Sequence, residues 1–108
     1  NIKNNLELFV NKICNENIIF SNKDFNDFDY SELNENDFVY IDPPYLISTG
    51  SYNDGKRGFK GWTEKEEYEL LNIINQLNKN KIRFALSNVI NHKGKINDIL
   101  QKWIIDND

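Results

Sequence analysis

Three segments of the chain place apolar side chains three and four positions apart, the spacing that is typical of an amphipathic helix. The first covers roughly residues 2–15. The second begins at Thr63, which forms the sequence pattern of a capping box with Glu66. The third follows Gly94 and runs through residues 96–104. The pattern therefore predicts three helices.

Short apolar runs at residues 18–20, 38–41 and 82–86 predict strands. Residues 21–36 are polar and rich in turn formers. Residues 46–61 hold four of the five glycines, so we expect a long, mobile loop there. Because the strands alternate with helices, the order predicts an α/β fold with a mostly parallel sheet that helices cover on both faces.

The length of 108 residues allows one domain at most, and three strands are too few for a stable doubly wound sheet. The chain contains no Met and ends at Asp108, just beyond an apolar helical pattern, so we expect a piece of a longer protein. A net charge of −4 excludes a strongly basic, self-sufficient DNA-binding module.

The single cysteine, Cys14, falls in a helical pattern and is expected to be buried. One cysteine forms no disulfide framework within a chain, which is compatible with a cytoplasmic protein. The sequence shows no apolar run long enough to span a membrane and no signal peptide.

The strand at 38–41 runs directly into Asp42, Pro43, Pro44 and Tyr45. A strand end followed by a proline turn is one interpretation, because Asp and Pro are common turn residues. The position favours another interpretation, since ligands of open α/β sheets bind beyond the carboxyl ends of strands. A carboxylate, a carbonyl group and a flat ring would then be held at the edge of the sheet.

The motif at 42–45 resembles the catalytic motif of the amino-group DNA methyltransferases, in the adenine-N6 branch of Dam-like enzymes. The resemblance extends from residue 18 to about 103 and is tightest at 37–45, 62–66 and 84–88. It implies a Rossmann-like methyltransferase sheet, with residues 1–108 as part of a catalytic domain. It also implies S-adenosyl-L-methionine as the cofactor, double-stranded DNA with a flipped adenine as the substrate, and a cognate restriction endonuclease as the partner system.

The amino group of adenine is a weak nucleophile, because its lone pair is delocalised into the ring. Two acceptors fixed on its N–H bonds would turn that lone pair toward the methyl group. In the resemblance these acceptors are the Asp42 carboxylate and the Pro43 carbonyl, which Pro44 holds in an extended backbone. Tyr45 would stack on the flipped base. Asp42 would also help to hold the methionine end of the cofactor.

Two further strand ends have counterparts in the family. Asp24 would accept a hydrogen bond from the cofactor's adenine and Phe25 would pack on its ring, or the pair forms an Asp turn with Phe25 in the core. Ser87 and Asn88 end the strand at 82–86, and the resemblance implies that they support the base pocket and the motif loop.

The loop after the motif mixes aromatic, basic and amide side chains, which suits an unstacked base and its flanking phosphates. Tyr52 and Arg57 are the candidate DNA contacts there. Trp62 is expected to staple the following helix instead. The acidic run at 64–69 is expected to be the N-terminal face of that helix, and His92 is expected to be solvated.

The chain departs from the family's pattern in two ways. The glycine-rich cofactor loop and an acidic residue for the cofactor ribose are not found in it, and neither is a target-recognition domain. We therefore expect residues 1–108 alone to bind S-adenosylmethionine weakly and not to turn over. Two alternatives remain: an RNA or protein methyltransferase with the same cofactor, and an inactive remnant of a truncated methyltransferase.

Overall fold

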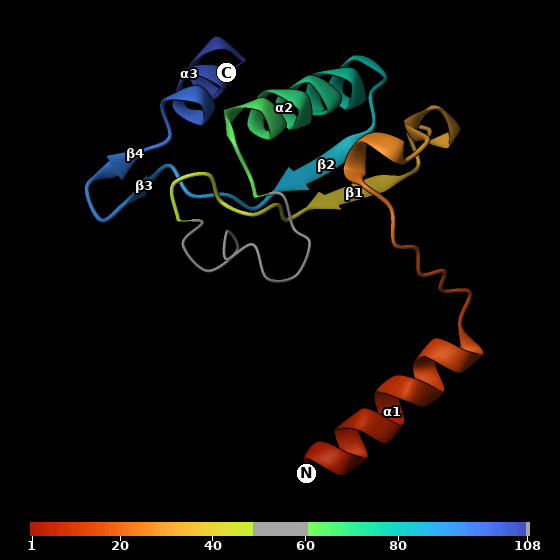
Figure 1. The fold of residues 1–108 in the computed structure, drawn as a ribbon. Helices are drawn as coiled ribbons and strands as arrows, with labels where there is room; N and C mark the ends of the chain where they lie inside the picture. Colours follow the sequence, from red (N-terminus) through yellow and green to blue (C-terminus); the bar gives the residue numbers. More distant parts are fainter. Residues whose placement is uncertain (49–60, 108) are drawn as a thin grey trace.

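The structure, a computed structural model, describes residues 1–48 and 61–107 (Figure 1). Its α-helices are α1 (Ile2–Asn15), α2 (Glu64–Lys79) and α3 (Asp98–Asp106). Its strands are β1 (Phe38–Ile41), β2 (Arg83–Leu86), β3 (Asn91–His92) and β4 (Lys95–Ile96). Two short 3₁₀ helices, η1 (Phe25–Asp27) and η2 (Tyr30–Glu32), precede β1.

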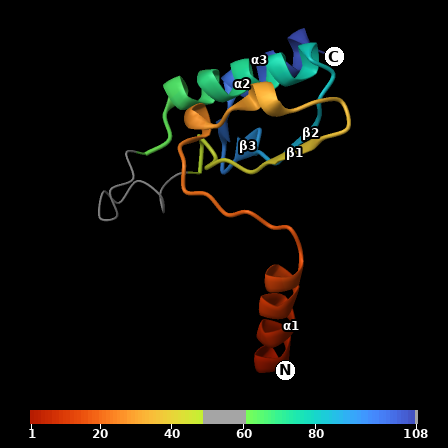
Figure 2. The same ribbon diagram turned by 90° about the vertical axis from the view of Figure 1, so that its right-hand side faces the viewer.

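Strands β1 and β2 form a parallel pair, with Phe38 opposite Arg83 and Ile41 opposite Leu86. A parallel pair needs a crossover between its strands, and α2 lies on that crossover. Helices α2 and α3 lie together on one face of the pair (Figures 1 and 2). Between them lies the core, which consists of Trp62, Leu70, Leu71, Ile74 and Leu100.

The expected α/β class and parallel pairing are confirmed for β1 and β2. The covering of both faces is not seen within the described residues. Phe38 and Tyr40 point away from the helices, and 59% and 67% of their surfaces are exposed.

Helix α1 has the predicted bounds, and the side chain of Asn1 caps its first turn. None of its residues is buried, and it lies apart from the rest of the chain (Figures 1 and 2). The prediction that Cys14 is buried is therefore wrong, since this side chain is exposed. Helical spacing identified the element, but within the described residues no partner covers its apolar stripe.

The predicted strand at 18–20 is wrong, because these residues form neither a helix nor a strand. Ile19 and Phe20 are 86% and 72% exposed. A strand is defined by its ladder of hydrogen bonds to a neighbour, and an apolar run of three residues does not supply that neighbour.

Helix α2 begins at the predicted capping box. The Thr63 side chain accepts from the Lys65 backbone, and the Glu66 carboxylate accepts from the backbone N–H of Thr63. At its other end Ile82 N donates to Leu77 O, and Lys81 adopts a left-handed φ of 57°. These features define a Schellman ending with Lys81 in the place usually taken by glycine.

Between β2 and α3 lies a hairpin that the sequence pattern did not predict. Asn91 pairs with Ile96 and His92 with Lys95 in antiparallel register. His92 is exposed, as expected. The predicted helix at 96–104 is confirmed as α3, whose N-cap is Asn97.

Candidate active site

The motif at 42–45 lies at the carboxyl end of β1, as the sequence predicted. The backbone N–H of Ser87 donates to the Ile41 carbonyl at 2.8 Å, so the parallel ladder extends to the last residue before the motif. Residues 42–45 and 87–88 consequently leave the sheet side by side. This is the edge at which open α/β sheets bind ligands.

A chain of hydrogen bonds joins the two strand ends. The hydroxyl of Tyr45 lies 2.9 Å from Oγ of Ser87 and donates to Oδ1 of Asp42 at 3.3 Å. An ionised carboxylate only accepts, so the single phenolic proton goes to Asp42 and Ser87 donates to Tyr45. This order fixes the ring of Tyr45 and orients the Asp42 carboxylate.

A hollow of about 200 Å³ opens at the motif, lined within the described residues by Asp42, Pro43, Pro44 and Tyr45. Asp42 is exposed while the other three are half-buried. Its Oδ2 accepts no hydrogen bond from the described residues. Within the described residues, the site therefore offers an incoming N–H group an unpaired carboxylate oxygen beside an aromatic ring.

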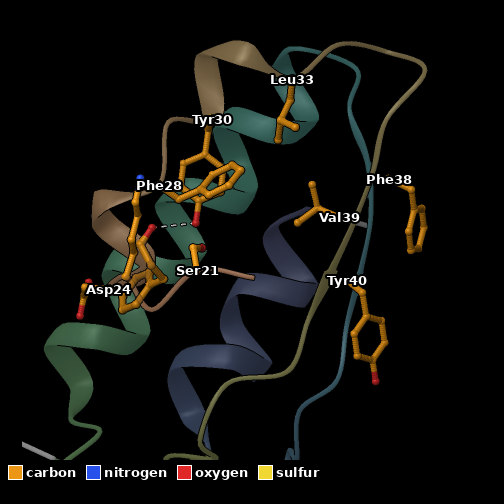
Figure 3. A pocket seen from close by; sticks show the side chains of 10 residues that line it. Ser21, Asp24, Phe28, Tyr30, Leu33, Phe38, Val39 and Tyr40 are labelled. Atoms are coloured by element: carbon orange, nitrogen blue, oxygen red, sulfur yellow. Dashed lines mark hydrogen bonds between the residues drawn. The ribbon is translucent and has the colours of Figure 1, made fainter. Parts of the chain in front are cut away.

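Asp24 and Phe25 lie at a separate cleft of about 380 Å³ along β1 (Figure 3). The cleft's other lining residues are Ser21, Lys23, Phe28, Tyr30, Leu33, Phe38, Val39 and Tyr40. This volume falls in the range of roughly 300–1,000 Å³ typical of small-molecule sites. Oδ1 of Asp24 accepts from Asn26 N and caps η1, and its other oxygen has no partner among the described residues.

Aromatic side chains hold the segment that carries Asp24. The ring of Phe25 packs on the ring of Trp62 at a centroid distance of 5.4 Å. The backbone carbonyl of Phe25 accepts a hydrogen bond from the Tyr30 hydroxyl at 2.8 Å. Burial, and then the nearby Asp24 carboxylate, raise the pKa of Tyr30. Phe25 is thus a packing residue that also lines the cleft, and one oxygen of Asp24 has no partner within the described part of the chain.

A fully buried carboxylate, Glu67, lies beneath the site. Its Oε2 accepts from Trp62 Nε1 at 2.7 Å, and its Oε1 accepts from Asn97 Nδ2 at 2.8 Å and Asn88 Nδ2 at 3.2 Å. No described Lys or Arg pairs with it. These hydrogen bonds are what offsets the cost of burying the charge.

The sequence analysis missed Glu67, because it assigned the whole acidic run at 64–69 to the N-terminal face of the helix. The signal was present in its spacing. Glu67 precedes Leu70, Leu71 and Ile74 by three, four and seven positions, so it lies on the inward stripe of α2. An acid on such a stripe needs hydrogen-bond donors around it.

The candidate DNA contacts Tyr52 and Arg57 lie outside the described residues. Trp62, which follows them, is 7% exposed and bonded to α2, as the stapling interpretation predicted. Ser87 hydrogen-bonds to Tyr45 of the motif, and Asn88 hydrogen-bonds to the buried Glu67.

The described part of the chain contains no helix with the length and apolar character needed to cross a membrane. Within residues 1–48 and 61–107, no three His, Cys, Asp or Glu side chains come together in a way that could hold a metal ion.

The comparison with protein families identifies the class. Residues 2–107 match the family described as D12 class N6 adenine-specific DNA methyltransferase. The match covers nearly the whole chain, and the chain belongs to this family.

Three relatives are modification enzymes. The chain is 55% identical over 103 residues to modification methylase StsI of Streptococcus sanguinis, and 49% identical over 102 residues to type II methyltransferase M.FokI of Planomicrobium okeanokoites. It is 48% identical over 80 residues to modification methylase LlaI of Lactococcus lactis subsp. lactis. These alignments cover 95%, 94% and 69% of the chain, but only 16%, 16% and 13% of the relatives.

Proposed function

We propose that this chain carries the catalytic strand end of a site-specific DNA adenine-N6 methyltransferase of the restriction–modification kind. The observation that carries the proposal is the placement of Asp42 at the end of β1, bonded through Tyr45 to Ser87 at the end of β2. Membership of the D12 class family supports the reaction type. The names of StsI, M.FokI and LlaI support a modification role.

The chain's own residues would prepare the adenine amine. Oδ2 of Asp42, which has no partner among the described residues, and the carbonyl of Pro43 would accept from its two N–H bonds. This would turn the nitrogen lone pair out of conjugation. Pro43 and Pro44 carry no N–H to compete for the acceptors. Acceptors that are fixed before reaction need no reorganisation in the transition state.

Tyr45 would hold the flipped base by stacking. A base inside a duplex is out of reach, so enzymes of this kind extrude it into a pocket with aromatic walls. The bonds of Tyr45 to Ser87 and Asp42 fix the ring in advance. Tyr52 and Arg57 remain proposed contacts to the DNA around the flipped base.

The cleft along β1 suits the purine of the cofactor. Aromatic and aliphatic side chains form most of its walls, and the Asp24 oxygen that is unpaired among the described residues can accept from an exocyclic amine. S-adenosylmethionine, when bound, supplies an activated methyl group on a sulfonium. Asp24 and Phe25 would hold its adenine and Asp42 its methionine end. The parallel pairing of β1 and β2 supports the proposal that they belong to a Rossmann-like methyltransferase sheet.

Nucleoside mass spectrometry tests the proposal. DNA from cells that express the intact protein should contain N6-methyladenine, and DNA from cells with the Asp42→Ala variant should not. An Asp37→Ala variant serves as the matched control, because Asp37 lies before β1, away from the motif. DNA without methyladenine, from cells in which RNA or protein carries the new methyl group, would overturn the DNA assignment.

A further inference from the structure

The β3–β4 hairpin is exposed along its whole length, from Asn91 to Ile96. Lys93 and Gly94 form its turn with φ angles of 50° and 78°. Positive φ at both central residues defines the tight turn that matches the twist of a two-stranded ribbon. Apart from its chain neighbours, no atom of the described residues lies within 4 Å of a Cβ built on Gly94. Within the described part of the chain, the buried core contains no residue of the hairpin.

The tip is basic although the chain carries a net charge of −4. Lys93 and Lys95 lie on either side of Gly94, and His92 pairs with Lys95 across the ribbon. Neither lysine forms an ion pair with an acid among the described residues, whose ion pairs lie within or at the ends of α1 and α2. Within the described part of the chain, no acidic partner competes with a ligand for either ammonium group.

Both ends of the hairpin are tied to the buried Glu67, and one end adjoins Ser87, which bonds to the motif. Asn88 precedes it and Asn97 follows it, and both side-chain amides donate to Oε1 of the buried Glu67. Asn97 N also donates to the carbonyl of Ile90 at 2.8 Å and closes the base of the ribbon. Ser87, which bonds to Tyr45, is the residue before Asn88.

These bonds place the hairpin beyond the carboxyl ends of β1 and β2, on the side of the sheet where the motif lies (Figure 1). A flipped adenine at Tyr45 stays attached to its own strand, whose phosphates continue to either side of the base. A basic ribbon anchored at this edge suits such phosphates, because lysine binds phosphate as a point charge.

We propose that the β3–β4 hairpin is a DNA-backbone contact, in which Lys93 and Lys95 each bind a phosphate near the target adenine. The inference rests on the proposed function and adds a surface to it. Phosphate contacts position a protein on a duplex without reading its sequence. Removing the two lysine charges should therefore lower the affinity equally for duplexes with and without the target site.

A charge-removal variant with a matched control tests the proposal in the intact protein. In Lys93→Asn/Lys95→Gln, Asn suits the left-handed turn position and Gln keeps the length of the side chain. The control is Lys79→Gln/Lys81→Asn, which removes the same charge at the opposite end of the sheet, where Lys81 has a φ of 57°. Binding to a duplex oligonucleotide is measured between about 50 and 200 mM salt, with thermal melts of each variant.

Each lost phosphate contact lowers the slope of log affinity against log salt by about 0.9. Between the lowest and highest salt concentrations, the factor by which affinity falls should therefore be roughly tenfold smaller for the hairpin variant than for wild type. At the lowest salt concentration, the variant should bind DNA more weakly than wild type. The control should keep the wild-type slope. If the double variant fails to fold, the single variant Lys95→Gln is measured instead, and its slope of log affinity against log salt should be lower than that of wild type by about 0.9.

A hairpin variant with the slope and affinity of the control would overturn the hairpin assignment, even if wild type methylates adenine. A wild-type protein that does not bind or methylate DNA would instead refute the proposed function. The two failures are thus distinguishable in one set of measurements.

Discussion

The phenolic oxygen of Tyr45 lies 2.9 Å from Oγ of Ser87, although the two residues are 42 positions apart in the sequence. Ser87 directly follows β2, and Tyr45 is the last residue of the motif that follows β1, so the parallel pair brings the two residues together. The contact joins a residue proposed to stack on the base to a residue outside the motif. It predicts that Ser87 affects catalysis through Tyr45.

Ser87→Ala should lower kcat about 2- to 10-fold and leave DNA affinity nearly unchanged, since a neutral hydrogen bond contributes about 0.5–1.5 kcal/mol. Tyr45→Phe should behave similarly because it keeps the ring. The double variant should be no worse than the more impaired single one. Single-turnover methyl transfer and duplex binding check these values, with Ser31→Ala as a control away from the motif. Additive losses would show that the two hydroxyls act independently.

Tyr45→Ala should do more harm than Tyr45→Phe, because it removes the ring as well as the hydroxyl. Stacking of a base on an aromatic side chain contributes about 1–3 kcal/mol. The measurement is the affinity for a duplex with an abasic or mismatched partner opposite the target adenine, in which the base flips easily. Equal affinities of the Ala and Phe variants for this duplex would count against stacking.

Glu67→Ala should destabilise the intact protein by roughly 3 kcal/mol or more, because three N–H donors lose their acceptor. Glu67→Gln should cost about 1–2 kcal/mol, since its amide group can accept through only one atom. Glu64→Gln is the matched control on the same helix, and its exposed side chain should change stability by less than about 0.5 kcal/mol. Denaturant titration gives all three values, and equal stability of the Glu67 and Glu64 variants would contradict the network.

The capping box of α2 should make stability depend on acid pH. Side-chain and backbone hydrogen bonds from Thr63 hold the pKa of Glu66 below its ordinary value. Because the pKa of Glu66 is lower in the folded state, the carboxylate contributes fully to the free energy of unfolding above the ordinary glutamate pKa. This contribution is lost as the pH falls through the pKa of Glu66 in the folded state. Glu66→Gln should flatten this part of the pH–stability curve, and Thr63→Ala should cost about 1 kcal/mol near neutral pH. A Glu66→Gln curve parallel to wild type throughout the acid range would refute the assignment.

Local signals in the sequence were sufficient for the elements that depend on neighbours in sequence. The capping box at Thr63 and the apolar stripe of α2 were predicted from spacing, and the strand before Asp42 from its run of apolar residues. The strand pairing followed from the alternation of helices and strands. These features rest on interactions within a few positions or on a strong topological preference.

The errors arose where a distant partner decides the outcome. The run at 18–20 has strand composition but no ladder, and the stripe of α1 has helical spacing but no cover within the described residues. The role of Glu67 was not predicted, because its three donors lie outside α2. The hairpin was missed because Asn91 and His92 are poor strand formers, although the Lys93-Gly94 turn was a usable signal.

The claim that Asp42 polarises the adenine amine is tested most directly by single-turnover methyl transfer with the purified intact protein, its cofactor and a duplex that contains the target adenine. Asp42→Ala should reduce the rate to near background while duplex binding stays measurable, and Asp37→Ala should keep the wild-type rate. An Asp42→Ala rate within a few-fold of wild type would contradict the account of the strand-end site.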